Sequence, residues 1–245
     1  MHAAPSIIGN QREAWRMAAQ AAPAGSLQAR FRTAPVKALQ ARDHLFFEGD
    51  ARKTVYLIEI GAVCLYRTLA DGRRQIFGFA LSGDFVGLHN CDVQSCSAQA
   101  LGLTRVRCIP AGSLKEVGRS DPQLGLQLYE TVSEQLMAAR DLLSTVGQRS
   151  AVERLASLLV AMSRRNARNG EDQRLINLPM TRSDIADFLS LTIETVSRTF
   201  TRFRQDDLIE LTHNTHVRIL NLPALEGLAA GEDTPAAFQS LAERI

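Results

Sequence analysis

Cysteine is scarce in this sequence, and its scarcity excludes two classes of protein. The four cysteines of the 245-residue chain, Cys64, Cys91, Cys96 and Cys108, are too few for a disulfide-rich secreted scaffold. They also lack the C-x-x-C spacing that is typical of zinc sites and thioredoxin-like redox sites. No apolar run approaches the roughly 18 residues of a membrane span, and the N-terminus lacks the pattern of a secretory signal. We therefore expect a soluble cytoplasmic protein that makes no membrane contact.

Sequence motifs of enzymatic chemistry are missing as well. The chain contains no G-x-G-x-x-G, H-E-x-x-H, P-loop or G-x-S-x-G pattern, the motifs that mark common nucleotide, metal and nucleophile sites. Its five histidines have no cluster of acidic residues around them, which leaves few candidates for acid–base catalysis. We expect neither an enzyme nor a bound cofactor or metal. The net charge of +2 neither requires nor excludes a polyanionic partner.

Short apolar runs separated by turn signals occupy the first half of the chain, from about Ala34 to Ser113. Examples are the runs 55–58, 62–66 and 75–80, and Asp71-Gly72 between the last two is a common hairpin turn. Short strands with regular glycine and aspartate punctuation predict an antiparallel barrel or jelly roll.

A long helix is predicted directly after these strands. Ser120-Asp121-Pro122 supplies a polar cap followed by proline at the first helical position. Apolar residues then recur every three or four positions, along one face: Leu124, Leu128, Val132, Leu136, Ala139, Leu143 and Val146. This stripe has two interpretations, packing against the strand domain or a subunit interface. The interface is favoured because the stripe is longer than one small domain needs, and we predict a homodimer formed through Leu124 to Leu143.

The segment from Thr181 to Gln205 predicts two short helices joined by a brief turn. Thr181 is a natural N-cap, and Asp184 lies where a carboxylate favours the helix dipole. After the turn 190–192, Thr192 caps the second helix. The residues expected to face inward are all apolar: Ile185, Ala186, Leu189, Val196, Phe200 and Phe203. This arrangement is typical of a helix-turn-helix.

The residues left on the outer face of the second helix form a polar surface suited to DNA. They are Ile193, Glu194, Ser197, Arg198 and Arg202. Arginine can donate two hydrogen bonds to guanine O6 and N7, and glutamate can accept one from cytosine N4. Glu194 and Arg198 are also one turn apart, so a solvated ion pair is the alternative interpretation, and one pair can serve both purposes. We predict base contacts from the first four residues of this surface.

Contacts to the DNA backbone are predicted for a second set of residues, because hydroxyls and arginines commonly bind phosphates. This set is Thr181, Arg182, Thr192, Thr195 and Arg202. Two strand-like runs, 208–211 and 216–220, follow the helices and make the module a winged helix. His213 and His216 in this hairpin are expected to be surface residues rather than metal ligands, because no partner lies at zinc spacing.

A strand roll, a long helix and then Leu-Thr-Ile-Glu-Thr-Val-Ser-Arg in a winged helix resemble the CRP/FNR superfamily of bacterial transcription regulators. The resemblance covers about Ala34 to Leu225 and is most specific from Asp184 to Phe203, where Glu-x-x-Ser-Arg is characteristic of the FNR side. An iron–sulfur cluster of the FNR type needs closely spaced N-terminal cysteines, and none precedes Cys64. The chain is therefore most similar to the FixK-type regulators of alphaproteobacteria.

The resemblance implies a homodimer that binds a palindrome of the TTGA…TCAA type, with half-sites about one helical turn apart. Carried onto this chain, it implies that Arg198 binds the guanine, Glu194 the cytosine opposite and Ser197 a neighbouring thymine. Many FixK-type members activate genes for low-oxygen respiration and nitrogen fixation by contacting RNA polymerase. We expect the same role here.

The cyclic-nucleotide-binding relatives carry a cassette, Gly-Glu…Arg-Ser-Ala, from which this chain departs. Leu88 stands where the glutamate would hold the ribose, and Cys96 stands where the arginine would hold the phosphate. Without that arginine a cyclic phosphate loses its charge-assisted bidentate partner. We therefore predict that the protein binds no cyclic nucleotide.

A sensor whose roll domain controls DNA binding through another ligand or through oxidation is the alternative function. Cys64 and Cys108 fall in strand-like runs and are expected to be buried core thiols. Cys91 and Cys96, near His89, are the candidates for a redox or metal pair. An inert thiol is the more frequent state of a cysteine that bears no disulfide.

The expected chain is thus an α+β protein with a double-stranded β-helix of the jelly-roll type. A second helix is expected from Ser150 to about Arg165, at the start of the DNA-binding module. The expected parts are a poorly ordered N-terminal extension (1–30), the β-roll (31–119), the dimerisation helix (120–148), the winged helix-turn-helix (149–225) and a C-terminal tail (226–245).

Overall fold

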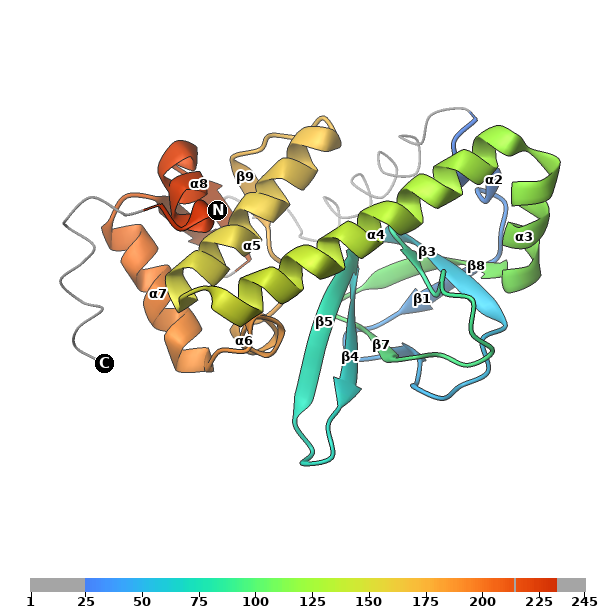
Figure 1. Ribbon diagram of the computed structural model, residues 1–245, viewed down its shortest axis with the longest axis horizontal. Coiled ribbons are helices and arrows are strands. Elements are labelled where there is room, and N and C mark those ends of the chain that lie inside the picture. Colours follow the sequence, from blue (N-terminus) through green and yellow to red (C-terminus); the bar gives the residue numbers. More distant parts are fainter. Residues whose placement is uncertain (1–24, 214, 233–245) are drawn as a thin grey trace, which may run out of the picture. The chain divides into compact units, whose positions relative to one another are not determined.

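Eight short strands lie between Val36 and Pro110 in the computed structural model, which describes residues 25–213 and 215–232 (Figure 1). They form two four-stranded antiparallel sheets. The first sheet has the order β1 (Val36–Leu39), β8 (Thr104–Pro110), β3 (Thr54–Ile60) and β6 (Phe85–Val86). The second has the order β2 (His44–Phe46), β7 (Ser97–Ala100), β4 (Ala62–Thr68) and β5 (Arg74–Leu81). The predicted jelly roll is confirmed.

The hairpin between β4 and β5 turns at the predicted Asp71-Gly72 pair. The Gly72 N–H donates to the Leu69 carbonyl at 2.9 Å, and the Leu69 N–H donates to the Arg73 carbonyl at 2.8 Å. The Asp71 carboxylate accepts from the Arg73 backbone N–H at 3.0 Å, which lowers the pKa of that carboxyl together with the Arg73 guanidinium. Gly72 has φ +81°, a conformation that glycine adopts without the Cβ penalty.

The apolar run of strand β3 is continuous because both faces of the strand are buried. Val55 and Leu57 point to one face of the first sheet, and Tyr56 and Ile58 point to the other, as the two-residue period of a strand requires. One face packs on the second sheet. The other packs beneath helices α2 (Leu27–Arg30) and α3 (Ala111–Ser120). A strand buried on both faces has no alternation of apolar and polar residues.

Helices α2 and α3 depart from the predicted organisation. Ser26 caps α2, and Leu27 and Phe31 are buried in the apolar cluster of the roll, so residues 26–30 belong to the roll rather than to the N-terminal extension. Residues 1–24 of that predicted extension lie outside the described residues. Helix α3 was not predicted because its glycines and the preceding proline obscure the helical pattern.

The long helix is confirmed as α4 (Pro122–Gln148), with the Asp121 carboxylate accepting from the N–H groups of Gln123 and Leu124. Neither this helix nor any other in the described parts of the chain is long and apolar enough to cross a membrane. Leu124 is only 7% exposed and Leu128 packs beside it, both on the apolar cluster of the roll. Because the first turns of α4 lie on that cluster, Leu124 is a core residue, which corrects its assignment to the subunit interface.

The C-terminal unit, which begins after Ala138, combines helices with a small antiparallel sheet in the order β10-β11-β9. Its elements are α5 (Ala151–Arg168), β9 (Leu175–Asn177), α6 (Arg182–Leu189), α7 (Ile193–Gln205), β10 (Ile209–His213), β11 (His216–Ile219) and α8 (Leu222–Ala230). The predicted helix after Ser150 and the wing hairpin are confirmed. Strand β9 was not predicted. The predicted boundary at residue 225 is wrong, because Leu225 and Leu228 of α8 are buried in this unit.

Gly61, in the turn between β3 and β4, provides a test of the roll. Its φ is +89°, and an added Cβ would lie 2.6 Å from the Leu103 carbonyl oxygen and 2.8 Å from Thr104 Cα. Gly61→Ala should therefore lower the free energy of unfolding by about 3 kcal/mol or more, through left-handed strain and overpacking against backbone. Urea unfolding monitored by circular dichroism measures this loss.

Gly72→Ala is the matched control. Gly72 has a similar φ of +81°, but an added Cβ would meet no atom within 4 Å beyond its own chain neighbours. It should cost only the left-handed strain, about 1–2 kcal/mol. Equal losses in the two variants would contradict the close backbone approach at Gly61.

Candidate nucleic-acid interface

Helix α6 begins at the predicted cap. The Thr181 hydroxyl accepts from the Asp184 N–H at 3.1 Å, and the Asp184 carboxylate accepts from the Thr181 N–H at 2.9 Å. The same carboxylate accepts a 2.7 Å hydrogen bond from the Thr181 hydroxyl. This reciprocal capping box satisfies backbone donors that have no partner within the helix. The start of the helix-turn-helix is therefore fixed by local hydrogen bonds.

The turn between α6 and α7 depends on one residue in an uncommon conformation. Ser190 ends α6 with φ +55° and ψ +48°, in the left-handed region. Helix α7 then begins after Thr192, whose hydroxyl accepts from the Thr195 N–H at 3.1 Å. The predicted cap of the second helix is confirmed.

The packed face of the two helices is the one that the apolar pattern predicts. All six residues expected to face inward are buried: Ile185, Ala186, Leu189, Val196, Phe200 and Phe203. Thr199 is buried beside them, with its hydroxyl donating to the Thr195 carbonyl at 2.8 Å. Since α7 is a single continuous helix of 13 residues, this packing decides which side chains remain outside.

The outer face of α7 carries the predicted base-contacting residues. Ile193, Glu194, Ser197 and Arg198 are all exposed. The Arg198 guanidinium donates to the Glu194 carboxylate at 2.5 Å, with the two side chains 72% and 71% exposed. A pair this exposed contributes only about 0.3–0.5 kcal/mol. The ion pair and the exposed surface therefore coexist, and both groups can exchange their partner at little cost.

Arg202 is less exposed than its place in the sequence pattern predicts. Its side chain is 25% exposed, and its Nε lies 3.5 Å from an oxygen of Asp206, one turn later. The side chain lies at the edge of the buried face rather than at the centre of the outer one. Its predicted exposure is therefore only partly confirmed, and the guanidinium lies at the rim of the surface.

Arg182 has a use that the sequence did not indicate. Its guanidinium carbon lies 3.4 Å from the centre of the Phe200 ring, in a half-buried position where burial lowers the pKa of the guanidinium. A cation over an aromatic face is attracted by the ring quadrupole. The side chain that was predicted to bind phosphate thus joins α6 to α7.

The described residues of the wing form no group of metal ligands. Among the residues described, no three or more histidine, cysteine, aspartate or glutamate side chains are grouped to hold an ion. His216 Nδ1 lies 3.0 Å from the Thr215 hydroxyl, as expected of a surface histidine. The side chain of His213 lies outside the described residues.

In the roll, the stretch that corresponds to the nucleotide cassette bonds to its own chain. Leu88 packs on the apolar cluster beneath α2 and α3, and Cys96 is buried between the sheets, where burial raises the pKa of its thiol. Arg52 Nε donates to the Gly87 carbonyl at 2.8 Å. Leu88 and Cys96, which the resemblance places at the ribose and phosphate positions, therefore both lie in apolar surroundings.

The cysteines separate into core and surface groups. Cys64 is buried in β4, and Cys108 is half-buried in β8, where burial raises the pKa of the thiol. The predicted burial is confirmed for Cys64, whereas Cys108 is only partly buried at the side of the core cluster. Cys91 is exposed whereas Cys96 is buried, so the two candidates for a redox pair lie in opposite environments.

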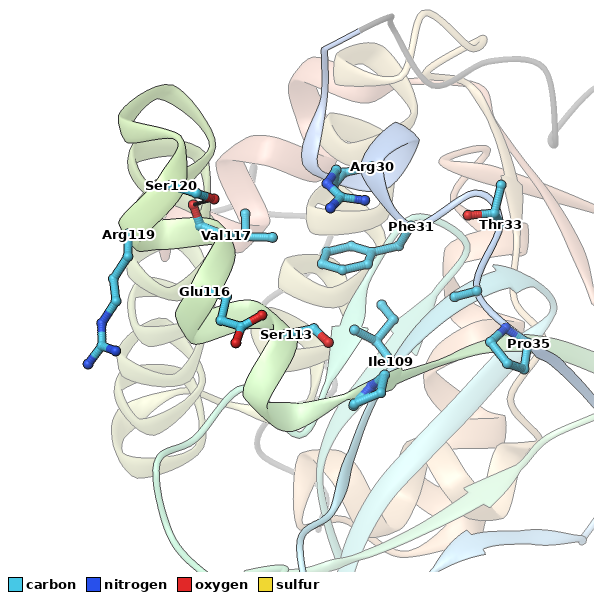
Figure 2. A pocket seen from close by; sticks show the side chains of 12 residues that line it. Arg30, Phe31, Thr33, Pro35, Ile109, Ser113, Glu116, Val117, Arg119 and Ser120 are labelled. Carbon is cyan, nitrogen blue, oxygen red and sulfur yellow. Dashed lines mark hydrogen bonds between the residues drawn. The ribbon is translucent and has the colours of Figure 1, made fainter.

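A cavity of about 600 Å³ lies between the end of α2 and α3 (Figure 2). Phe31, Ile109 and Val117 form its buried apolar part, and Arg30 and Glu116 are among the exposed polar residues at its edge. The sequence did not indicate this cavity because α3, which forms one wall, was not predicted.

The fold and the exposed face of α7 define a sequence-specific DNA-binding transcription regulator with a winged helix-turn-helix behind a β-roll. Residues 153–228 match the family model of the Crp-like helix-turn-helix domain, and residues 36–121 match the cyclic nucleotide-binding domain. The chain belongs to the CRP/FNR family, on its FixK-type side. Members of this family are transcription regulators and not enzymes.

Two curated relatives and one solved structure support this assignment. The transcriptional activatory protein AadR of Rhodopseudomonas palustris is 40% identical over 77% of this chain and 79% of its own length. The nitrogen fixation regulation protein FixK of Bradyrhizobium diazoefficiens is 38% identical over 76% of this chain and 78% of its own. The structure of FixK2 from Bradyrhizobium japonicum superposes with a TM-score of 0.74 at 31% identity, covering 83% of this chain and 98% of that one.

Arg182→Ala distinguishes the two uses of this arginine. Loss of the contact with Phe200 should lower the free energy of unfolding by about 1–2 kcal/mol, because the cation–π contact is partly desolvated. The affinity for random duplex DNA should keep its dependence on salt. Chemical unfolding and DNA titrations at several salt concentrations measure the two effects.

Arg164→Ala is the control for this measurement. Arg164 pairs with Glu226 at 3.1 Å, but its side chain is exposed, so its loss should change stability by no more than about 0.5 kcal/mol. A stable Arg182→Ala variant whose salt dependence falls by about one phosphate contact would instead support the phosphate role.

Proposed function

We propose that this protein is a homodimeric activator that binds a TTGA…TCAA palindrome and switches on genes for low-oxygen respiration or nitrogen fixation. The observation that carries the proposal is the outer face of α7, where Glu194, Ser197 and Arg198 are exposed on a helix fixed by its buried face. Its partners in this role are DNA and RNA polymerase, so the proposed location is the cytoplasm.

Each of the four predicted base-contacting residues of α7 has a chemically matched partner in a half-site. Arg198 donates two hydrogen bonds to guanine O6 and N7, and Glu194 accepts from N4 of the cytosine opposite. Ser197 bonds a neighbouring thymine, and Ile193 offers apolar contact to a thymine methyl. The weak ion pair of the unbound protein supports this role, because Glu194 holds Arg198 extended along the helix before DNA arrives.

Backbone contacts in this proposal come from the rim of the surface. The exposed hydroxyls of Thr181 and Thr192 lie at the N-termini of α6 and α7, where helix dipoles favour phosphate. The Thr195 hydroxyl lies 2.8 Å from that of Thr192 and belongs to the proposed phosphate site at the N-terminus of α7. Arg202 completes the set from the edge of the buried face, and Arg182 contributes only if it leaves Phe200.

The homodimer is supported by the apolar surface of α4. Val132, Leu136 and Leu143 are 43%, 52% and 74% exposed, and Ala139 is exposed between them. Leu126, Tyr129 and Met137 of the same helix are exposed as well. Large contiguous apolar patches are uncommon on monomers, so a second copy of this helix is the proposed cover. Leu128, half-buried on the roll, lies at the border of this interface.

The activator role and the regulated processes come from the relatives. AadR is named as an activatory protein and FixK as a regulator of nitrogen fixation, and each shares more than a third of its aligned residues with this chain. Activation in this proposal proceeds through contact with RNA polymerase. A repressor that only blocks promoters would need no such contact.

Selection from random duplex DNA tests the proposed function. The wild-type protein should enrich an inverted repeat with TTGA half-sites about one helical turn apart, because two copies of α7 then meet equivalent grooves. Enrichment of a direct repeat, or of no sequence, would contradict the proposal.

Arg198→Ala should weaken binding to the enriched site by about 1–3 kcal/mol and relax discrimination at the guanine. Arg202→Ala should weaken binding to specific and random duplexes alike and reduce the salt dependence, because a phosphate contact carries no base information. Fluorescence anisotropy titrations on matched and guanine-substituted duplexes measure both. If Arg198→Ala lowers the affinity for specific and random DNA equally, the proposed base contact of Arg198 is disproved.

Cyclic nucleotide should have no effect on this protein. Leu88 and Cys96 are packed in apolar surroundings, so a cyclic phosphate would be desolvated without a charged partner. Millimolar cyclic AMP should leave the melting temperature unchanged, whereas saturation a hundredfold above a dissociation constant would add about 2.7 kcal/mol to stability. A saturable rise in melting temperature would contradict this prediction.

Gating of DNA binding by another ligand or by oxidation is the second candidate function. The cavity between α2 and α3 and the exposed Cys91 are the observations that favour it. Titration of DNA binding with and without reductant and oxygen, on wild-type and Cys91→Ser protein, tests gating by oxidation. Equal affinity in all conditions would contradict gating by oxidation.

A further inference from the structure

Arg154, in the first turn of α5, reaches the turn of the helix-turn-helix. Its NH1 donates to the Leu189 carbonyl at 3.0 Å and to the Ser190 carbonyl at 3.4 Å. Its Nε donates to the Arg149 carbonyl at 2.8 Å. One half-buried guanidinium thus joins three backbone carbonyls from two parts of the C-terminal unit.

The turn has a physical need for this cation. The last carbonyls of any helix have no partner within the helix, and the C-terminal end of a helix dipole favours a positive charge. Helix α6 has no basic residue in its own last turn, and Ser190 holds a left-handed conformation without being glycine. Arg154 supplies both the hydrogen bonds and the charge from a different helix.

The other end of the contact is the connection between α4 and α5. Arg149 lies in this connection, and its NH1 donates to the Ser157 hydroxyl at 2.8 Å and to the Ala229 carbonyl. The connection is therefore itself anchored, to α5 and to the end of α8. Through Arg154, this anchored segment is linked to the end of α6 and the turn into α7.

We propose that Arg154 is a positioning residue for DNA recognition, which holds the helix-turn-helix turn against the α4–α5 connection so that α7 presents Arg198 at the correct angle. Arg154 itself touches no base in this proposal. The proposal rests on the proposed role of Arg198. It adds that sequence specificity also depends on a side chain outside the recognition helix. A misplacement of about 1 Å in a binding group is enough to lose much of its effect.

The test compares Arg154→Ala and Arg154→Lys with Arg164→Ala, a control on the same helix whose partner is Glu226 of α8. The probes are the duplex that the wild-type protein enriches from a random pool and a random duplex of equal length. Because the probe is the duplex that the protein itself enriches, the test of Arg154 remains valid even if the half-site differs from the proposed TTGA. Melting temperatures are measured for every variant.

Arg154→Ala should weaken binding to the enriched duplex at least about tenfold, the order of a lost bidentate base contact. Binding to random DNA should stay within about twofold, because phosphate contacts tolerate small changes of angle. Lysine lacks the planar fork that reaches several carbonyls. The affinity of Arg154→Lys for the enriched duplex should therefore lie between those of Arg154→Ala and the wild type. The lysine variant carries the test if the alanine variant does not fold.

A double-mutant cycle separates positioning from general destabilisation. If Arg154 acts through Arg198, adding Arg198→Ala to Arg154→Ala should cost clearly less than it costs in the wild type, because the base contact is already impaired. Full additivity overturns the proposal, as does an equal loss on specific and random DNA. An Arg154→Lys variant that binds the enriched duplex as wild type does also overturns it.

Discussion

The packing of α7 on α6 is the constraint from which the DNA-binding surface follows. Val196, Phe200 and Phe203 are buried at helical spacing, so the opposite face of the same helix must carry Glu194 and Arg198 into solvent. Burial of large apolar side chains contributes about 1.5–3 kcal/mol each, far more than the exposed ion pair. The direction of the polar residues is therefore set by the apolar ones.

Arginines in this module serve two opposite physical purposes. Arg198 is exposed and holds a carboxylate that it can release, because water screens the pair. Arg154 and Arg182 are half-buried, one on backbone carbonyls and one on an aromatic ring. Displacement of Arg154 would leave carbonyls without a hydrogen-bond donor, and displacement of Arg182 would remove a cation–π contact. Residue type alone does not separate a guanidinium left exposed to solvent from one that holds the helices in place.

The roll has the fold of a cyclic nucleotide-binding domain, and its own side chains must be examined one by one. The two sheets and their clusters are those of a nucleotide-binding domain, yet Leu88 and Cys96 occupy apolar surroundings. Polar groups nearby, such as Arg52, bond to the chain itself. Function in this family is therefore argued from the side chains of the site and not from the architecture.

The sequence by itself determined several features that depend on neighbours a few residues away. The capping box at Thr181, the cap at Thr192 and the Asp71-Gly72 turn all form from contacts within a few residues, and apolar periodicity identified the buried face of α7. Only the tertiary structure decided that Leu124 joins the roll, that Arg182 covers Phe200 and that α8 completes the C-terminal unit. These depend on residues distant in the chain, whose proximity is decided by packing, and local patterns carry no information about such contacts.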